Sequence, residues 1–129
     1  MFVTPEGTVL VNEVAPRPHN SGHHTIRANV TSQFEQHWRA ILNLPLGSTK
    51  EYGPAGMLNL LGEEGYEGEA VYEGMEVLLG AEQIFPFLYG KAITRPFRKM
   101  GHVTIMDDTI EGLEAKVQLV KESIKVISK

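Results

Sequence analysis

A run of side chains that could bind an anion or a metal ion lies near the start of the chain, from Asn12 to His23. It holds an acid, a guanidinium, two imidazoles, amides and a hydroxyl, and it contains two prolines. Polar groups at this density would each need a partner if they were taken out of water. The run is therefore predicted to be a binding or catalytic loop rather than part of a core.

The two prolines predict a stiff, extended loop after the strand-like Val9–Val11, because each fixes its own φ and favours extended geometry in the residue before it. Alternate side chains of an extended segment point the same way. Glu13, Arg17 and His19 are thereby grouped on one side of the loop. Gly22 is expected to permit a turn that would be strained for any other residue.

Glu13 lies beside Asn12 at the end of that strand. Carboxylate and amide oxygens are the hard ligands that Mg²⁺ prefers, usually together with phosphate oxygens and water. From the residues alone, Glu13 is either such a ligand or a solvated acid that ends a strand. Arg17 and His19 are likewise either surface residues or contacts to an anion, which a guanidinium can bind bidentately.

A basic cluster lies in the second half of the chain and contrasts with an acidic stretch from Glu63 to Glu73. It consists of Lys91, Arg95, Arg98 and Lys99. Such a cluster is either a solvated edge that discourages strand pairing or an anion site.

Two blocks of sequence resemble one family. Residues 12–23 resemble the metal and substrate loop of the carboxyaminoimidazole ribonucleotide synthetases, which are ATP-grasp enzymes of purine biosynthesis, also called the ATPase subunit of phosphoribosylaminoimidazole carboxylase. Residues 88–91 and 95–102 resemble the C-terminal signature of the same family, in the same order. The resemblance runs from about Phe2 to the end of the chain but covers only the C-terminal part of a family enzyme, so we expect the chain to be a fragment.

The resemblance implies roles for the first block. Asn12 would lie in the nucleotide site, and Glu13 would be one of the carboxylates that hold magnesium on the ATP phosphates. The other acidic ligand would fall immediately before residue 1. Arg17 and His19 would contact bicarbonate or the carboxyphosphate made from it, as catalytic residues.

The resemblance also implies which residues bind the second substrate, aminoimidazole ribonucleotide. Asn20 and Ser21 would donate hydrogen bonds to it, and Lys91, Arg98 and Lys99 would hold its 5′-phosphate.

The chain departs from the family at Phe97, where the family has glycine, so the phosphate loop is expected to be less free to adopt a positive φ. His23 and His24 receive no role from the resemblance, and each is expected either to pack or to face water.

Composition excludes several classes. A chain of 129 residues makes at most one ordinary domain, and a net charge of −4 disfavours a general nucleic-acid binder. Without cysteine there is no disulfide, thiolate metal site or thiol nucleophile. No apolar run reaches the roughly eighteen residues of a membrane helix, and no secretory signal is present, so a soluble cytoplasmic protein with no membrane partner is the default.

The pattern predicts an α+β fold. A hairpin is expected from Phe2–Thr4 and Thr8–Val11, and Ser32 with Glu35 forms a capping box before a helix that ends at Pro45 and buries its aromatic face. Gly47–Pro54 has the composition of a linker.

Beyond that linker, three strands and two helices are expected. The strands are Met57–Leu61, Phe85–Tyr89 and His102–Met106. Val71–Leu79 is expected to be a short helix with Met75, Leu78 and Leu79 on one side. A final helix, opened by Asp108 and carrying apolar residues as far as Ile127, should cover one face of a small sheet.

Together these expectations describe the C-terminal end of an ATP-grasp domain, residues 1–46, followed by a small sheet-plus-helix domain of the rudimentary hybrid-motif type, residues 47–129. The intact enzyme would use ATP, Mg²⁺ and bicarbonate to carboxylate aminoimidazole ribonucleotide, as a homodimer, and the fragment alone would be inactive. Two alternatives remain. One is a formate-dependent glycinamide ribonucleotide transformylase, whose loop usually carries aspartate and threonine at the positions of Asn20 and Ser21. The other is a non-catalytic module that binds phosphate.

Overall fold

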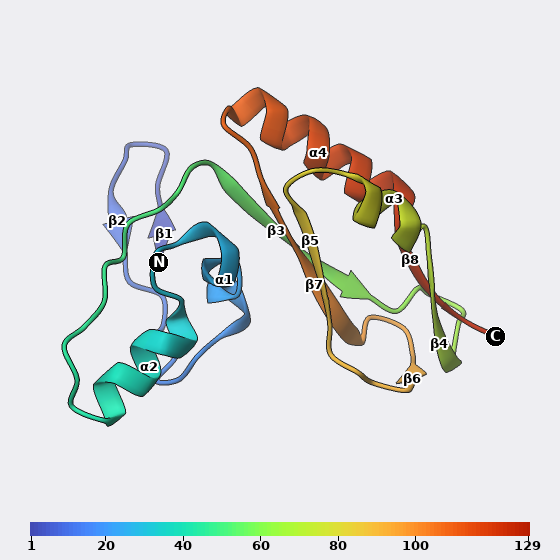
Figure 1. The fold of residues 1–129 in the computed structure, drawn as a ribbon, viewed down its shortest axis with the longest axis horizontal. Coiled ribbons are helices and arrows are strands. Elements are labelled where there is room, and N and C mark those ends of the chain that lie inside the picture. The colour runs from blue at the N-terminus through green and yellow to red at the C-terminus, as the bar shows by residue number, and fades with distance from the viewer.

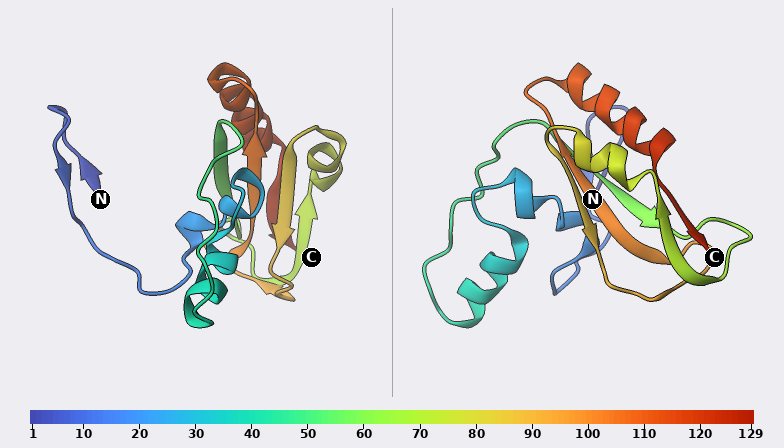
Figure 2. Two further views of the ribbon diagram at one scale, coloured as in Figure 1. Left: turned by 60° about the vertical axis from the view of Figure 1, so that its left-hand side comes forward. Right: turned by 45° about the vertical axis from the view of Figure 1, so that its right-hand side comes forward.

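The chain begins with a short hairpin that stands away from the rest of the molecule. The computed structural model describes all residues, 1–129. β1 (Phe2–Val3) pairs antiparallel with β2 (Val9–Leu10), and Gly7 closes the turn with a φ of +82°. The predicted hairpin is confirmed, and Figure 2 shows that a long extended segment separates it from the other elements.

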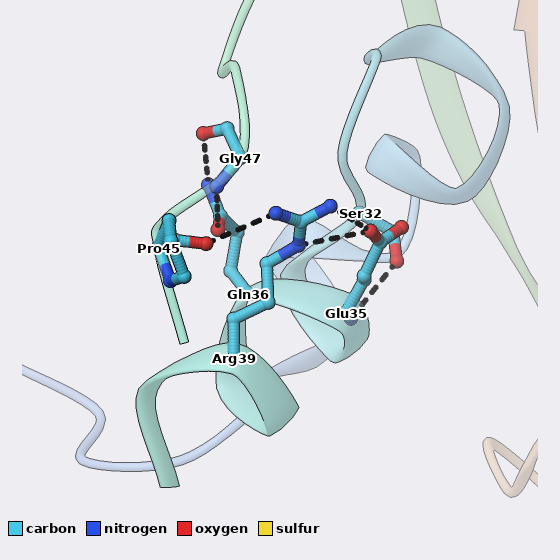
Figure 3. Close-up of polar contacts among 6 residues, drawn as sticks. All are labelled: Ser32, Glu35, Gln36, Arg39, Pro45 and Gly47. Atoms are coloured by element: carbon cyan, nitrogen blue, oxygen red, sulfur yellow. Dashed lines mark hydrogen bonds and ion pairs between the residues drawn. The ribbon is translucent and has the colours of Figure 1, made fainter. Parts of the chain in front are cut away.

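Three short helical elements follow the extended segment, namely η1 (Asn20–Gly22), α1 (Thr25–Ala28) and α2 (Gln33–Ile41). The predicted cap of α2 is confirmed, because the Ser32 hydroxyl accepts a hydrogen bond from the Glu35 backbone N–H at 3.2 Å. Figure 3 shows how α2 also fixes the chain that leaves it: Arg39 donates to the Pro45 carbonyl oxygen at 3.0 Å, and Gln36 exchanges two hydrogen bonds with the backbone of Gly47.

The aromatic face of α2 is not buried, so that prediction is wrong. Trp38 is 62% exposed, Ile41 is 60% exposed and Phe34 is 39% exposed. The helix packs against α1, and most of its apolar side stays open to solvent. The periodicity placed the apolar residues on one face correctly, but a periodic pattern cannot show whether a partner for that face lies within the same chain.

A three-stranded antiparallel sheet forms the centre of the second half. Its order is β3 (Ala55–Leu61), β7 (Lys99–Met106) and β5 (Ile84–Leu88). The three predicted strands are therefore confirmed, within a few residues at their ends. The register of β5 on β7 places Phe87 opposite His102.

A second sheet was not predicted. Its order is β6 (Ile93–Thr94), β4 (Gly68–Glu73) and β8 (Lys125–Ser128), and an isolated bridge between Gly62 and Val126 joins it to the end of β3. The expected helix over Val71–Leu79 is thus wrong in its first half, which is strand. Gly74, with a φ of +79°, separates that strand from α3 (Met75–Gly80).

The apolar residues expected on one side of α3 differ in their burial. Leu78 is fully buried, whereas Leu79 is 69% exposed. Consecutive side chains of a helix point about 100° apart, so Leu78 faces the sheet and Leu79 does not.

The last helix is shorter than predicted. α4 (Ile110–Ser123) begins after Thr109, whose hydroxyl caps the Gly112 N–H at 3.0 Å in place of the expected Asp108. Ile127 belongs instead to β8, where it pairs with Val71. None of the helices combines the length and apolar character that crossing a lipid bilayer requires.

α3 and α4 cover one face of the central sheet (Figures 1 and 2), as predicted for the last helix. The core between them consists of Leu60, Leu78, Ile84, Met100, Val103, Ile105, Val120 and Val126. Side chains alternate along a strand, so His102 and Thr104 of β7 lie on the opposite face from Val103 and Ile105. That second face is the one α1 contacts, and both polar side chains are buried there.

Candidate functional site

The loop after Pro18 is held in place by Gln33, the first residue of α2. Its Oε1 accepts from the His19 N–H at 2.8 Å, its Nε2 donates to the His19 carbonyl oxygen at 2.8 Å, and Nε2 lies 2.7 Å from Nδ1 of His23. Gly22 does not adopt a positive φ, so its expected role is wrong. Its lack of a side chain matters in another way, because a Cβ there would lie 2.6 Å from Oε1 of Gln33 and would displace that side chain.

His19 turns its Nδ1 back onto the loop. This nitrogen accepts from the Ser21 N–H at 3.3 Å and lies 3.0 Å from the Ser21 hydroxyl. A ring nitrogen that accepts from a backbone N–H is unprotonated, so the proton of the neutral imidazole is on Nε2. His19 can therefore donate a hydrogen bond to a negatively charged oxygen without giving up its contacts to the loop.

The loop contacts the end of the central sheet through Asn20. The Lys99 ammonium donates to Oδ1 of Asn20 at 3.1 Å, and Nδ2 of Asn20 donates to the Tyr89 hydroxyl at 3.5 Å. Lys91 donates to the Lys99 carbonyl oxygen at 2.6 Å, and its ammonium lies 5.5 Å from the centre of the Tyr89 ring. The structure thus joins the two sequence blocks that carry the family resemblance.

These side chains form what we call the loop–sheet cluster, which consists of His19, Asn20, Ser21, Tyr89, Lys91, Lys99 and His102. It gathers two ammonium groups, an amide, two hydroxyls and an imidazole in one place, with the second imidazole, that of His102, buried beside them. Such a set is suited to a small phosphorylated ligand that also carries hydrogen-bonding groups.

His102 is the buried member of the cluster, at 2% exposure. Its Nδ1 lies 3.1 Å from the Tyr89 hydroxyl. Its ring stacks on the ring of Phe87, with 5.2 Å between centroids, and the centroid of the His23 ring lies 5.1 Å from its own. Together with Ile26 and Phe34, these rings line an open, mainly apolar pocket.

Burial changes the titration of three members of this region. It lowers the pKa of His102, and the nearby His23 lowers that pKa further. It also lowers the pKa of His23, with smaller contributions from the charges of His19 and Lys99. Burial raises the pKa of Tyr89, against the opposing effect of the Asn20 hydrogen bond. At neutral pH the two imidazoles and the phenol are therefore uncharged.

Four of the predicted site residues are not drawn into the cluster by any hydrogen bond or ion pair. Asn12 and Glu13 are exposed and make no side-chain hydrogen bond. Arg17 donates to the carbonyl oxygen of its neighbour Pro18 at 3.2 Å, and Arg98 donates to the Ile93 carbonyl oxygen at 2.7 Å.

The donor set for a magnesium ion is incomplete. No three His, Cys, Asp or Glu side chains lie close enough together to hold a metal ion, and Glu13 is the only carboxylate of the loop. The residues present therefore fit one ligand of a metal site that would need further groups.

Phe97 adopts a φ of +62°, so the loop takes the positive φ that a side chain disfavours but does not prevent. The turn around it is fixed by three backbone hydrogen bonds: Phe97 N–H to Gly62 O at 2.8 Å, Gly62 N–H to Arg98 O at 2.9 Å, and Arg98 N–H to Arg95 O at 3.0 Å. These hydrogen bonds hold the backbone in the left-handed conformation, although the conformation costs free energy for a residue with a Cβ.

Sequence reasoning missed Gln33 and gave no role to His23, Tyr89 or His102. One signal was available. His102 and Thr104 alternate with Val103 and Ile105 along a predicted strand, and two polar residues on one face of a covered sheet need hydrogen-bonding partners.

Comparison with known proteins agrees with this architecture. Residues 1–34 match the profile of the ATP-grasp domain, and residues 55–116 match that of the phosphoribosylaminoimidazole carboxylase C-terminal domain. The N5-carboxyaminoimidazole ribonucleotide synthase of Bacillus subtilis is 51% identical over 106 residues, which are 82% of this chain and 26% of that protein.

Solved structures give the same result. The crystal structure of N5-carboxyaminoimidazole ribonucleotide synthetase from Thermotoga maritima matches with a TM-score of 0.96 and 56% identity, over 100% of this chain and 36% of that one. The Aspergillus clavatus N5-carboxyaminoimidazole synthase, solved with ADP and 5-aminoimidazole ribonucleotide, matches with a TM-score of 0.81 and 33% identity, over 95% of this chain and 33% of that one.

The fold and the two matched profiles define an α+β protein of the ATP-grasp superfamily, with the end of an ATP-grasp domain followed by a small C-terminal domain. Within that superfamily, the chain belongs to the N5-carboxyaminoimidazole ribonucleotide synthetase family. It spans about a quarter of the Bacillus relative and about a third of the Thermotoga one.

Proposed function

We propose that this chain forms the aminoimidazole-ribonucleotide side of the active site of an ATP-dependent ligase that carboxylates this ribonucleotide with bicarbonate. The observation that carries the proposal is the Lys99–Asn20 hydrogen bond of 3.1 Å, which joins the two family motifs into one surface. The solved Aspergillus relative, which holds ADP and the ribonucleotide, supports the choice of substrates.

Each member of the surface then has a task that its chemistry suits. Lys91 and Lys99 of the cluster bind the 5′-phosphate, and Arg98, next to Lys99 in the chain but outside the cluster, is proposed as a third contact, since two ammonium groups and a guanidinium favour a dianion. Asn20 and Ser21 hydrogen-bond the ribonucleotide. In the overall reaction, ATP phosphorylates bicarbonate to carboxyphosphate, the exocyclic amine takes the carboxyl group, and ADP and phosphate are released.

Arg17 and His19 are the proposed contacts to bicarbonate and carboxyphosphate. The exposed Arg17 guanidinium uses one N–H on the Pro18 carbonyl oxygen and keeps the others for a ligand, and His19 keeps Nε2–H as a donor. Preorganised donors of this kind stabilise the negative charge that a phosphoryl transfer spreads over its oxygens.

ATP and magnesium would meet this chain at Asn12 and Glu13. Glu13 would supply one carboxylate to a magnesium ion that neutralises the ATP phosphates. Both side chains are exposed, which leaves them free to share a site with further protein groups and with the ATP phosphates.

The proposed division of the chain is residues 1–46 as the end of the ATP-grasp domain and residues 47–129 as the small C-terminal domain. The two profile matches, which end at residue 34 and begin at residue 55, support a boundary in this interval. Homodimer formation remains a prediction from the family resemblance, and a cytoplasmic location remains a prediction from the composition of the sequence.

Titration of the chain with aminoimidazole ribonucleotide, followed by calorimetry, tests the proposal. We expect binding that Lys91→Gln or Arg98→Gln weakens by about tenfold or more, because each removes a charged partner of the phosphate. Lys121→Gln, on the exposed side of α4, is the matched control and should bind as the unchanged chain does. Equal affinity in all variants would refute the proposed phosphate site.

Turnover separates the remaining functions. The chain alone should release no ADP, whereas a chimera that joins the preceding part of the Bacillus relative to this chain should release ADP when aminoimidazole ribonucleotide and bicarbonate are both present. Turnover that needs formate in place of bicarbonate would favour the transformylase. Tight ribonucleotide binding by this chain, combined with an inactive chimera, would favour the non-catalytic module.

A further inference from the structure

Tyr89 is the point at which the loop and the basic cluster meet. Its hydroxyl oxygen accepts from Nδ2 of Asn20 at 3.5 Å, and its ring lies 5.5 Å from the ammonium of Lys91. One half-buried side chain thus contacts two of the residues proposed to bind the ribonucleotide, through two different parts of its structure.

The hydrogen bonds around the hydroxyl fit one arrangement. The Asn20 amide N–H can only donate, so the hydroxyl accepts from it and keeps its own proton for another partner. Nδ1 of His102 lies 3.1 Å away and can receive that proton when the imidazole is the neutral tautomer with its proton on Nε2. Burial lowers the pKa of His102, which favours the neutral form.

The imidazole that receives this proton cannot easily rotate. His102 is 2% exposed, stacks on Phe87 with 19° between the ring planes, and has the His23 ring 5.1 Å away. Tyr89 itself is fixed at its backbone, where its N–H donates to the Met100 carbonyl oxygen at 2.9 Å. The hydroxyl is therefore held from behind, at a fixed place on the sheet.

We propose that Tyr89, backed by His102, is a positioning residue for the ribonucleotide site: its hydroxyl orients the Asn20 amide, and its ring places the Lys91 ammonium. This inference rests on the proposed function, because it concerns the same site. It assigns the hydroxyl and the ring separate roles, which two substitutions can separate.

Tyr89→Phe removes the hydroxyl and keeps the ring, whereas Tyr89→Leu removes both. Side-chain NMR of the whole chain would follow the Asn20 amide, the Lys91 side-chain methylene next to the ammonium and Nδ1 of His102. Tyr89→Phe should shift the Asn20 and His102 signals and leave Lys91 in its ring-shifted position. Tyr89→Leu should shift all three.

Tyr66→Phe is the matched control, because Tyr66 is 41% exposed and makes no side-chain hydrogen bond. It should change none of these signals. Urea unfolding of each variant accompanies the NMR, so that only spectra of folded chains are compared. If Tyr89→Phe leaves the Asn20 and His102 signals as Tyr66→Phe does, the positioning role is refuted, and it is also refuted if Tyr89→Phe shifts Lys91 as strongly as Tyr89→Leu.

Affinity for aminoimidazole ribonucleotide gives the functional readout. Loss of one ordering hydrogen bond should weaken binding about two- to tenfold in Tyr89→Phe. Tyr89→Leu should weaken it further, and inorganic phosphate, which does not need Asn20, should lose affinity only in Tyr89→Leu. No binding of the ribonucleotide to the unchanged chain would overturn the proposed function, while the NMR comparison still decides whether Tyr89 positions Asn20 and Lys91.

Discussion

Replacing Phe97 by glycine and, separately, by alanine would measure what the left-handed backbone at this position costs. Both changes remove the ring, which is 69% exposed, so they differ only in the Cβ. At a φ of +62° a Cβ costs roughly 1–2 kcal/mol. The greater freedom of glycine in the unfolded chain offsets roughly 0.4–1 kcal/mol of this. The glycine variant should therefore be about 0.8 kcal/mol more stable than the alanine variant.

Urea unfolding followed by circular dichroism would measure the difference. With a slope of about 2 kcal/mol per molar, the two midpoints should differ by about 0.4 M. The same pair of changes at Arg95, which lies in the same turn without a positive φ, is the control and should show the opposite order. An alanine variant at position 97 as stable as the glycine variant would refute the claim that this backbone is strained.

Two further outcomes concern stability. The Lys116 ammonium, 2.8 Å from the Asp107 carboxylate, and the Thr109 backbone N–H together lower the pKa of Asp107 from 3.8 to about 2. The stabilisation is therefore present above the ordinary pKa and is lost as the pH falls through about 2. Asp107→Asn should abolish this part of the acid sensitivity of the urea midpoint. Gly74→Ala should destabilise the chain by about 2 kcal/mol or more, because Gly74 has a φ of +79° and a Cβ there would overlap the Ser123 carbonyl oxygen. Gly80 has open space around it, so Gly80→Ala is the control and should not destabilise the chain in this way.

Local signals in the sequence were sufficient for much of the fold. The turn at Gly7 and the cap at Ser32 depend on neighbouring residues only, and both occur as predicted. The end of α4 depends on something else. Ile127 continues the helical spacing but pairs with Val71, far away in the sequence, and no local pattern records that pairing. The second sheet was missed for the same reason.

The candidate site shows the same division. Resemblance between motifs singled out Asn20 and Lys99, which the structure joins directly. The roles of Tyr89 and His102 could not be inferred in this way, because they follow from the register that sets Phe87 opposite His102 and from the placement of His23 over that ring. A sequence motif readily identifies the residues that contact a ligand. It identifies less readily the residues that position those ligand contacts.

The hydrogen bond between Lys99 and Asn20 joins residues that are 79 positions apart, one in the loop and one in the central sheet. A phosphorylated ligand that gripped both side chains would act as a crosslink between the two segments. By thermodynamic linkage, the ligand would stabilise the docked position of the loop on the sheet. If the loop were docked for only part of the time, the apparent affinity would fall in proportion to the docked fraction. Ligand binding and docking of the loop on the sheet are thus coupled equilibria.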